Sequence, residues 1–95
     1  MLFMVIERFR GQDPDPVYRR LAEGGRSMPD GLAYVGSWIE PGFDRCFQLM
    51  ECDDARLLQA WVLQWKDLMT FEIVPVVPSA ETREVMAARL KEATP

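Results

Sequence analysis

LAYVGSWIEPGFDRCFQLMEC, residues 32–52, contains two runs of strand-forming residues on either side of a turn at Pro41 and Gly42. Residues 32–40 and 45–52 mix aromatic, β-branched and polar side chains, which is the composition of strands. A Pro-Gly pair favours a tight reversal of the chain. The stretch therefore predicts an antiparallel hairpin.

Helix and strand patterns follow one another on both sides of this hairpin. Before it, residues 2–9 (LFMVIERF) are apolar enough for a buried strand, and two Asp-Pro pairs introduce a helix over residues 14–23. After it, Asp53 or Asp54 is expected to cap an amphipathic helix. The apolar positions of this helix recur every three or four residues and are Leu57, Leu58, Trp61, Val62, Trp65, Leu68 and Met69.

The chain is expected to close with a strand over residues 70–77 and a weaker helix over residues 81–92, capped by Ser79. Pro75 cannot donate a ladder hydrogen bond, so this strand belongs at a sheet edge. The order β-α-β-β-α-β plus a C-terminal helix is that of the ferredoxin-like α+β fold. Right-handed crossovers then give a four-stranded antiparallel sheet in the order 4-1-3-2, with the last strand on an edge.

One domain accounts for the chain. Its 95 residues, 48% hydrophobic and 27% charged, are typical of a single globular unit and unlike a disordered segment. We expect this ferredoxin-like domain to cover residues 1–78 and a helical extension to cover residues 79–95.

Charge and composition exclude several classes of protein. A net charge of -4 disfavours nucleic acid and anionic membranes as partners, and no apolar run is long enough to span a bilayer. The absence of histidine removes the commonest general base, zinc ligand and haem ligand, so neither a metal nor a cofactor is expected. Cys46 and Cys52 lie too far apart along one expected strand to form a disulfide. Reduced thiols suit a cytoplasmic protein.

Alternation along the strands divides the side chains between two faces of the sheet. The face expected under the helices carries Met4, Ile6, Val35, Ile39, Phe47, Leu49, Phe71, Ile73 and Val77. The opposite face carries Phe3, Val5, Glu7, Phe9, Tyr34, Gly36, Trp38, Cys46, Gln48, Met50, Glu72, Val74 and Val76. Because no helix within the first 78 residues covers this second face, we expect a second copy of the chain to cover it, in a homodimer.

Four segments carry a resemblance to a known family. MLFMVIERF, MPDGLAYVGSWIE, RCFQLMECDD and FEIVPVV resemble a family of short bacterial proteins known only as a domain of unknown function. The likeness extends to about Val77, and RCFQLMECDD is its most specific part. The family is similar in plan to the dimeric α/β-barrel superfamily, which implies a homodimer with a pocket between helices and sheet or inside the barrel.

Known members of that superfamily include cofactor-free monooxygenases, muconolactone-type isomerases, haem-handling enzymes and ligand-sensing domains. The haem-handling branch as a rule ligates iron through histidine, so the lack of histidine disagrees with it. The resemblance implies no catalytic residue, because the family itself has no established activity to carry over.

Two carboxylates form the first candidate site. A register that places Leu2 opposite Val77 also places Glu7 opposite Glu72 on one face. Two carboxyl groups at that spacing raise each other's pKa, as a proton-transfer site requires. Alternatively, both lie in water at a barrel mouth, or they share an arginine.

The second candidate site is a ligand pocket on the hairpin. A three-residue turn sets Gly36 opposite Gln48 and Trp38 opposite Cys46, so that an amide lies over a position without a side chain, between the rings of Tyr34 and Trp38. This is the shape of a small-molecule pocket. Alternatively, the rings are simply part of a dimer core.

Two classes of function remain, and the sequence leaves open whether the chain is an enzyme. One is a homodimer that binds a small, largely apolar molecule without chemistry. The other is a cofactor-independent isomerase or monooxygenase-like enzyme with Glu7 as its proton-transfer group. A buried Glu7 beside a cavity would favour chemistry, and a solvated Glu7 would favour binding alone. Trp61 and Trp65 are expected in the core, and Arg26 on the solvated surface, although an arginine inside the barrel would suit an anionic ligand.

Overall fold

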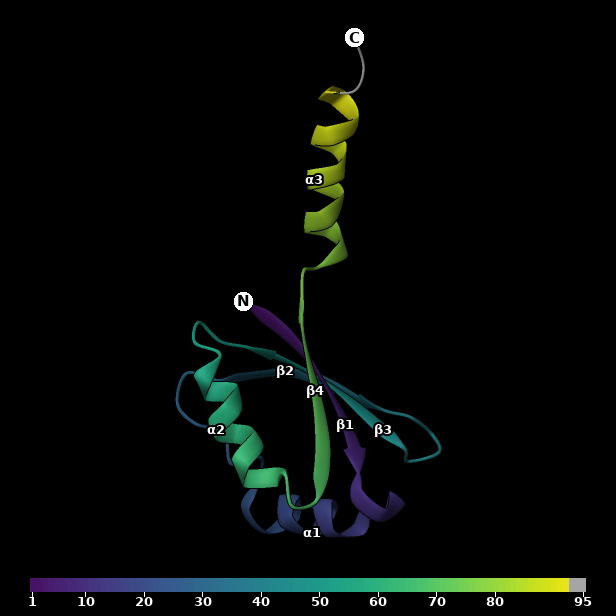
Figure 1. Ribbon diagram of the computed structural model, residues 1–95, viewed down its shortest axis with the longest axis vertical. Coiled ribbons are helices and arrows are strands. Elements are labelled where there is room, and N and C mark those ends of the chain that lie inside the picture. Colours follow the sequence, from purple (N-terminus) through teal and green to yellow (C-terminus); the bar gives the residue numbers. More distant parts are fainter. Residues whose placement is uncertain (93–95) are drawn as a thin grey trace.

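The computed structural model describes residues 1–92 and confirms the expected order of elements (Figure 1). The strands are β1 (Leu2–Phe9), β2 (Ala33–Ile39), β3 (Arg45–Glu51) and β4 (Met69–Val76). The helices are α1 (Asp15–Gly24), α2 (Arg56–Trp65) and α3 (Ser79–Glu92), and a short 3-10 turn, η1 (Arg10–Gln12), follows β1. The end of the expected helical extension, residues 93–95, lies outside the described residues.

The four strands form one open antiparallel sheet in the order β2-β3-β1-β4. This is the predicted order, so the ferredoxin-like α+β fold is confirmed. Pro75 lies in β4, which is an edge strand, as its missing backbone donor requires.

Local sequence signals explain where the two packed helices begin and end. Asp13 accepts the backbone N–H of Asp15 through Oδ1 at 3.1 Å, just before the first turn of α1. Gly25 ends that helix with a φ of 69°, a conformation that glycine adopts without steric cost. Asp54 accepts the backbone N–H of Arg56 at the start of α2. That helix ends at Trp65, so the last apolar positions expected on it belong to a turn and to the start of β4.

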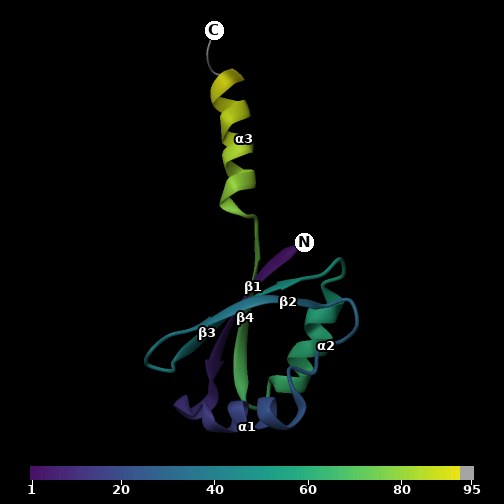
Figure 2. The same ribbon diagram turned by 180° about the vertical axis from the view of Figure 1, so that it is seen from behind.

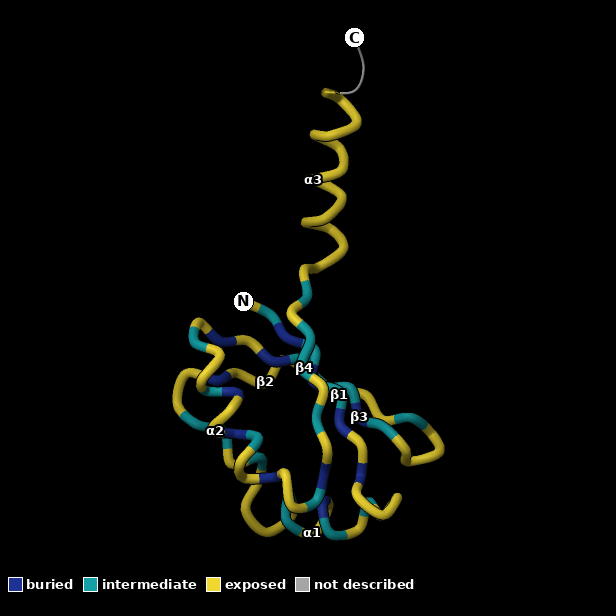
Figure 3. The backbone as a smooth tube through the Cα atoms, in the orientation of Figure 1, coloured by how far each residue is buried: buried dark blue, intermediate teal, exposed yellow. Residues whose placement is uncertain are grey.

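α1 and α2 pack on the same face of the sheet, and this face is not the one predicted for β1 and β3 (Figures 1 and 2). Buried and less buried residues alternate along both strands, as Figure 3 shows. The buried set is Phe3, Val5, Glu7 and Phe9 in β1 and Cys46, Gln48 and Met50 in β3. These residues were expected on the uncovered face. Both faces of these strands are largely apolar, so alternation alone does not say which face the helices cover, and the polar residues Glu7 and Gln48 lie in a pocket under the helices.

The register between β1 and β4 is one residue away from the prediction. Leu2 pairs with Val76, so Glu7 lies opposite Phe71, and Glu72 lies opposite Ile6. A shift of one residue moves a side chain to the other face of a sheet. The predicted pairing of the two carboxylates is therefore wrong.

The uncovered face of the sheet, called here the open face, is rich in apolar side chains. Its apolar residues are Leu2, Met4, Ile6, Trp38, Phe47, Leu49, Val74 and Val76. Trp38 is 58% exposed, which is unusual for so large an aromatic side chain. Within residues 1–92, the two helices with buried residues both contribute them to the core on the other face.

α3 extends away from the sheet and its two packed helices (Figure 1). None of its described residues is buried, and Val85 and Met86 are among those exposed. A helix with so little packing adds little to the core of the domain. The arrangement supports our proposal that the folded domain ends near residue 78.

Deleting the chain from Ala80 onward is expected to leave a domain that still unfolds cooperatively. The core residues all precede this point, so the hydrophobic contribution to stability is retained. Thermal unfolding followed by circular dichroism is the measurement. A truncated chain without a cooperative transition would show that α3 is structural and that the proposed domain limit is wrong.

Candidate functional site

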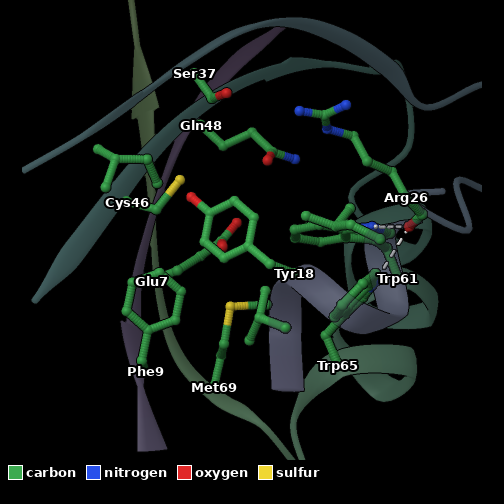
Figure 4. Close-up of a pocket in the computed structure, with 13 residues that line it drawn as sticks. Glu7, Phe9, Tyr18, Arg26, Ser37, Cys46, Gln48, Trp61, Trp65 and Met69 are labelled. Atoms are coloured by element: carbon green, nitrogen blue, oxygen red, sulfur yellow. Dashed lines mark hydrogen bonds between the residues drawn. The ribbon is translucent and has the colours of Figure 1, made fainter. Parts of the chain in front are cut away.

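A pocket of about 190 Å³ lies between the helix-covered face of the sheet and the two packed helices (Figure 4). Its apolar walls include the rings of Phe9, Trp61 and Trp65. Its polar groups come from β1, α1, the loop after α1, β2 and β3, and they are Glu7, Tyr18, Arg26, Ser37, Cys46 and Gln48. An apolar cavity with a few converging polar groups is the usual form of a small-molecule site.

Strand alternation and one bulge bring these groups together. β1 directs Glu7 into the pocket between two core residues, and β3 does the same with Cys46 and Gln48. In β2 the register shifts between Tyr34 and Gly36. After this bulge, Ser37 rather than Gly36 lies opposite Gln48 and lines the pocket.

Glu7 is the most unusual polar group of the pocket. Its side chain is only 4% exposed, and Oε1 has no hydrogen-bond partner among residues 1–92. Burial raises the pKa of Glu7 from 4.5 to about 7, although the positive charge of Arg26 acts in the opposite direction. Glu7 therefore holds a proton over most of the acidic range and exchanges it near neutral pH.

The neighbouring acids of the pocket also keep their protons. Burial, with the nearby Glu7, raises the pKa of the Cys46 thiol to about 12, against a smaller opposing effect of Arg26. Burial is also the largest cause of the raised pKa of the Tyr18 hydroxyl. Because a thiolate is the reactive form of cysteine, Cys46 is poorly suited to nucleophilic catalysis.

Arg26 lines the pocket although it was expected on the solvated surface, and Ser37 and Tyr18 line it although neither was predicted as a site residue. The carbonyl oxygen of Arg26 accepts hydrogen bonds from Nε1 of Trp61 at 2.9 Å and of Trp65 at 3.0 Å (Figure 4). Its guanidinium carbon lies 3.8 Å from the ring centroid of Tyr34, whose hydroxyl is hydrogen-bonded to Oγ of Ser37. The two indoles thus hold the backbone of Arg26 in place, and the side chain of this residue lines the pocket.

The other predicted site residues are divided between the two faces. Gln48, 5% exposed, joins Glu7 in the pocket, and its Nε2 donates to Sδ of Met50. Tyr34 pairs with Met50 and lies beside the pocket, against Arg26, rather than in the pocket lining.

Gly36, Trp38 and Glu72 lie on the open face, away from Glu7. The pairing predicted for the first two is wrong, because the bulge in β2 sets Gly36 opposite Leu49. A Cβ at Gly36 would lie 3.5 Å from the ring of Trp38. These two residues are neighbours, but they do not form one site with Gln48.

The described part of the chain contains neither a candidate metal-binding group nor a candidate membrane-spanning helix. Among residues 1–92, no three side chains of histidine, cysteine, aspartate or glutamate come together in a group that could hold a metal ion. None of the helices in that range is long and apolar enough to cross a membrane.

Fold and site together define a ferredoxin-like α+β domain with a pocket between its helices and its sheet. The chain matches the family described as "Domain of unknown function (DUF3303)" over residues 1–90, and it belongs to that family. This confirms the resemblance to a family without an established activity. Neither the curated proteins nor the solved structures include a match to the chain.

Proposed function

We propose that the chain binds a small, largely apolar molecule in the pocket between helices and sheet, with Glu7 as the polar anchor. The observation that supports this is the burial of Glu7, which lines the pocket and whose Oε1 atom has no hydrogen-bond partner in residues 1–92. A buried polar atom without a partner is costly, so a ligand that supplies one gains affinity.

The size of the pocket restricts the ligand. A volume of about 190 Å³ is below that of most drug-binding pockets. It somewhat exceeds the roughly 150 Å³ of an engineered apolar cavity that binds benzene. One ring with a short polar substituent fits this space, and the rings of Phe9, Trp61 and Trp65 offer it edge and face contacts.

Filling the pocket is expected to abolish binding, and Ser37 and Gly36 offer a matched pair for this test. Ser37 lines the pocket, whereas its neighbour Gly36 lies on the open face. In a nuclear magnetic resonance screen of single-ring fragments, Ser37→Leu should therefore lose the binding that wild type shows. Gly36→Leu should keep that binding, because its new side chain lies on the opposite face of the sheet.

The tryptophan indole N–H signals are suitable reporters for this screen. Trp61 and Trp65 line the pocket, and the signal of Trp38, which lies on the open face, can be removed by Trp38→Phe. Fragments that bind Ser37→Leu as well as wild type would place the site elsewhere.

The second candidate function is a cofactor-independent, isomerase-like or monooxygenase-like enzyme with Glu7 as its proton-transfer group. Glu7 is buried and lines a pocket, which is the outcome expected above to favour chemistry over binding alone. The pKa of Glu7, raised by burial to about 7, favours it, because such a carboxyl group can both take up and return a proton at neutral pH. Exchange of a carbon-bound proton of a bound fragment for deuterium, present in wild type and lost in Glu7→Gln, would distinguish this function from binding alone.

We further propose that two copies of the chain pair through their open faces. The sequence prediction of a homodimer rested partly on Phe3, Val5 and Met50, which lie under the helices instead. The open face is nevertheless apolar over the middle of both central strands, β1 and β3, with the charged Arg8, Arg45 and Glu51 at the strand ends. An isologous pair would cover this surface with its own copy.

A cytoplasmic location is also part of the proposal. Cys46 and Cys52 are both free and buried. Buried free thiols suit a reducing compartment, where disulfides are rare.

A further inference from the structure

Arg26 brings a positive charge to the pocket, and no acidic side chain of residues 1–92 forms an ion pair with it. The ion pairs among residues 1–92 join Arg8 to Asp44, Arg20 to Asp67, Arg45 to Glu40 and Arg56 to Asp54. In the same part of the chain, the guanidinium of Arg26 donates no hydrogen bond to a protein oxygen and contacts the ring of Tyr34. Its N–H donors are therefore available to a ligand.

Contacts to its backbone and to its side chain hold Arg26 in place. The two indole hydrogen bonds to its carbonyl oxygen, at 2.9 and 3.0 Å, fix its backbone against α2. Stacking on the ring of Tyr34 orients the guanidinium, and the hydroxyl of Tyr34 is hydrogen-bonded to Oγ of Ser37. Figure 4 shows the side chain extending from the indoles toward the side of the pocket where Ser37 and Gln48 lie. A side chain held in this way loses little freedom when it binds an anion.

We propose that the ligand of this pocket is a small monocyclic carboxylate, whose ring lies against the aromatic walls and whose carboxylate is bound by the guanidinium of Arg26. This inference rests on the proposed function and adds a charge requirement to it. A planar guanidinium binds a carboxylate through two parallel N–H···O bonds, a geometry that a neutral amide does not reproduce. The pocket volume of about 190 Å³ limits the ring part to a single ring.

Protonation of Glu7 is coupled to binding of such a carboxylate, because Arg26 acts on both. The titratable or charged groups that line the pocket with Glu7 are Tyr18 of α1, Cys46 of β3 and Arg26 of the loop after α1. Of these, Arg26 lowers the pKa of Glu7, so a carboxylate bound to Arg26 would weaken this effect and favour the protonated form of Glu7. Affinity for the carboxylate should therefore fall as pH rises through about 7, because Glu7 then ionises beside the bound anion.

The test compares benzoate with benzamide, its neutral analogue of nearly the same shape. Each is titrated into the full chain at pH 6, and the indole N–H signals of Trp61 and Trp65 report binding. We expect benzoate to bind at least about tenfold more tightly than benzamide, the effect of a charge-assisted pair of hydrogen bonds. Arg26→Gln should remove this preference. Arg19→Gln, a change at an exposed arginine of α1 outside the pocket, should retain it.

The outcomes test the carboxylate proposal separately from the proposal that the pocket binds small molecules. If benzamide binds as tightly as benzoate, or if the preference survives Arg26→Gln, the pocket still binds small molecules but the charge requirement is wrong. If neither benzoate nor cyclohexanecarboxylate binds at millimolar concentration, the carboxylate class is also wrong, and the fragment screen with Ser37→Leu decides the proposed function independently. The benzoate and benzamide comparison on wild type needs no variant, so it holds even if Arg26→Gln does not fold.

Discussion

Replacing Glu7 with glutamine is expected to increase the free energy of unfolding near pH 8 by roughly 3 kcal/mol over wild type. In the unfolded chain this carboxyl group has its ordinary pKa of 4.5, whereas burial raises the value in the folded protein to about 7. Between these pH values the folded state binds more protons than the unfolded state. The contribution of Glu7 to the free energy of unfolding is therefore complete below about pH 4.5 and is lost as the pH rises through 7. Glutamine resembles the protonated acid and removes this decline.

The measurement is chemical unfolding at about pH 4 and pH 8, followed by tryptophan fluorescence at one fixed protein concentration. Near pH 4, Glu7→Gln should match wild type, since the wild-type carboxyl group is protonated there in both states. Glu72→Gln is the matched control. It lies in the adjacent strand, opposite Ile6, with its side chain exposed on the other face. This control should follow wild type at both pH values. Equal pH dependence in wild type and Glu7→Gln would show that Glu7 is solvated when folded.

Element order and strand order could be predicted because they depend on local signals. Pro75 marks an edge strand whatever surrounds it, and the spacing of apolar residues in α2 is visible within one segment. These signals gave the correct sheet order, β2-β3-β1-β4. Strand bounds were likewise predicted to within a residue or two, since turn residues such as Pro41 and Gly42 interrupt the apolar runs.

Faces and registers could not be predicted in the same way. Both sides of β1 are apolar, so alternation separates the two sets of side chains without saying which one the helices cover. Glu7 and Gln48 were expected on the uncovered side, yet both are buried in the pocket. Polar residues kept at buried positions are frequent at functional sites, where local rules are broken.

The bulge in β2 and the role of Arg26 depend on contacts between distant parts of the chain. A bulge between Tyr34 and Gly36 adds one residue to a strand that otherwise reads as regular. Arg26 enters the pocket because Trp61 and Trp65, far along the chain, bind its carbonyl oxygen. The two indoles were correctly expected in the core, and their N–H groups, which need partners when buried, were the available hint.

Leu49→Glu is expected to convert the proposed homodimer into a monomer of 11.0 kDa. Leu49 lies on the open face, between Met4 of β1 and Gly36 of β2, and so near the middle of the proposed interface. Its loss from both copies removes about 3 kcal/mol or more of apolar burial, which corresponds to more than about a hundredfold in the dissociation constant. Two carboxylates near a two-fold axis also repel each other.

Leu63→Glu is the matched control for this experiment. Leu63 is 67% exposed on α2, so the same substitution there adds the same charge away from the open face. Sedimentation at micromolar concentration should give about twice the chain mass for wild type and for this control, and the chain mass for Leu49→Glu. Because Leu49 is only partly buried in the single chain, the variant should fold and keep the pocket on the other face, so fragment binding should persist. A wild-type chain that sediments as a monomer would contradict the dimer, and fragment binding lost together with the dimer would mean that the partner copy contributes to the site.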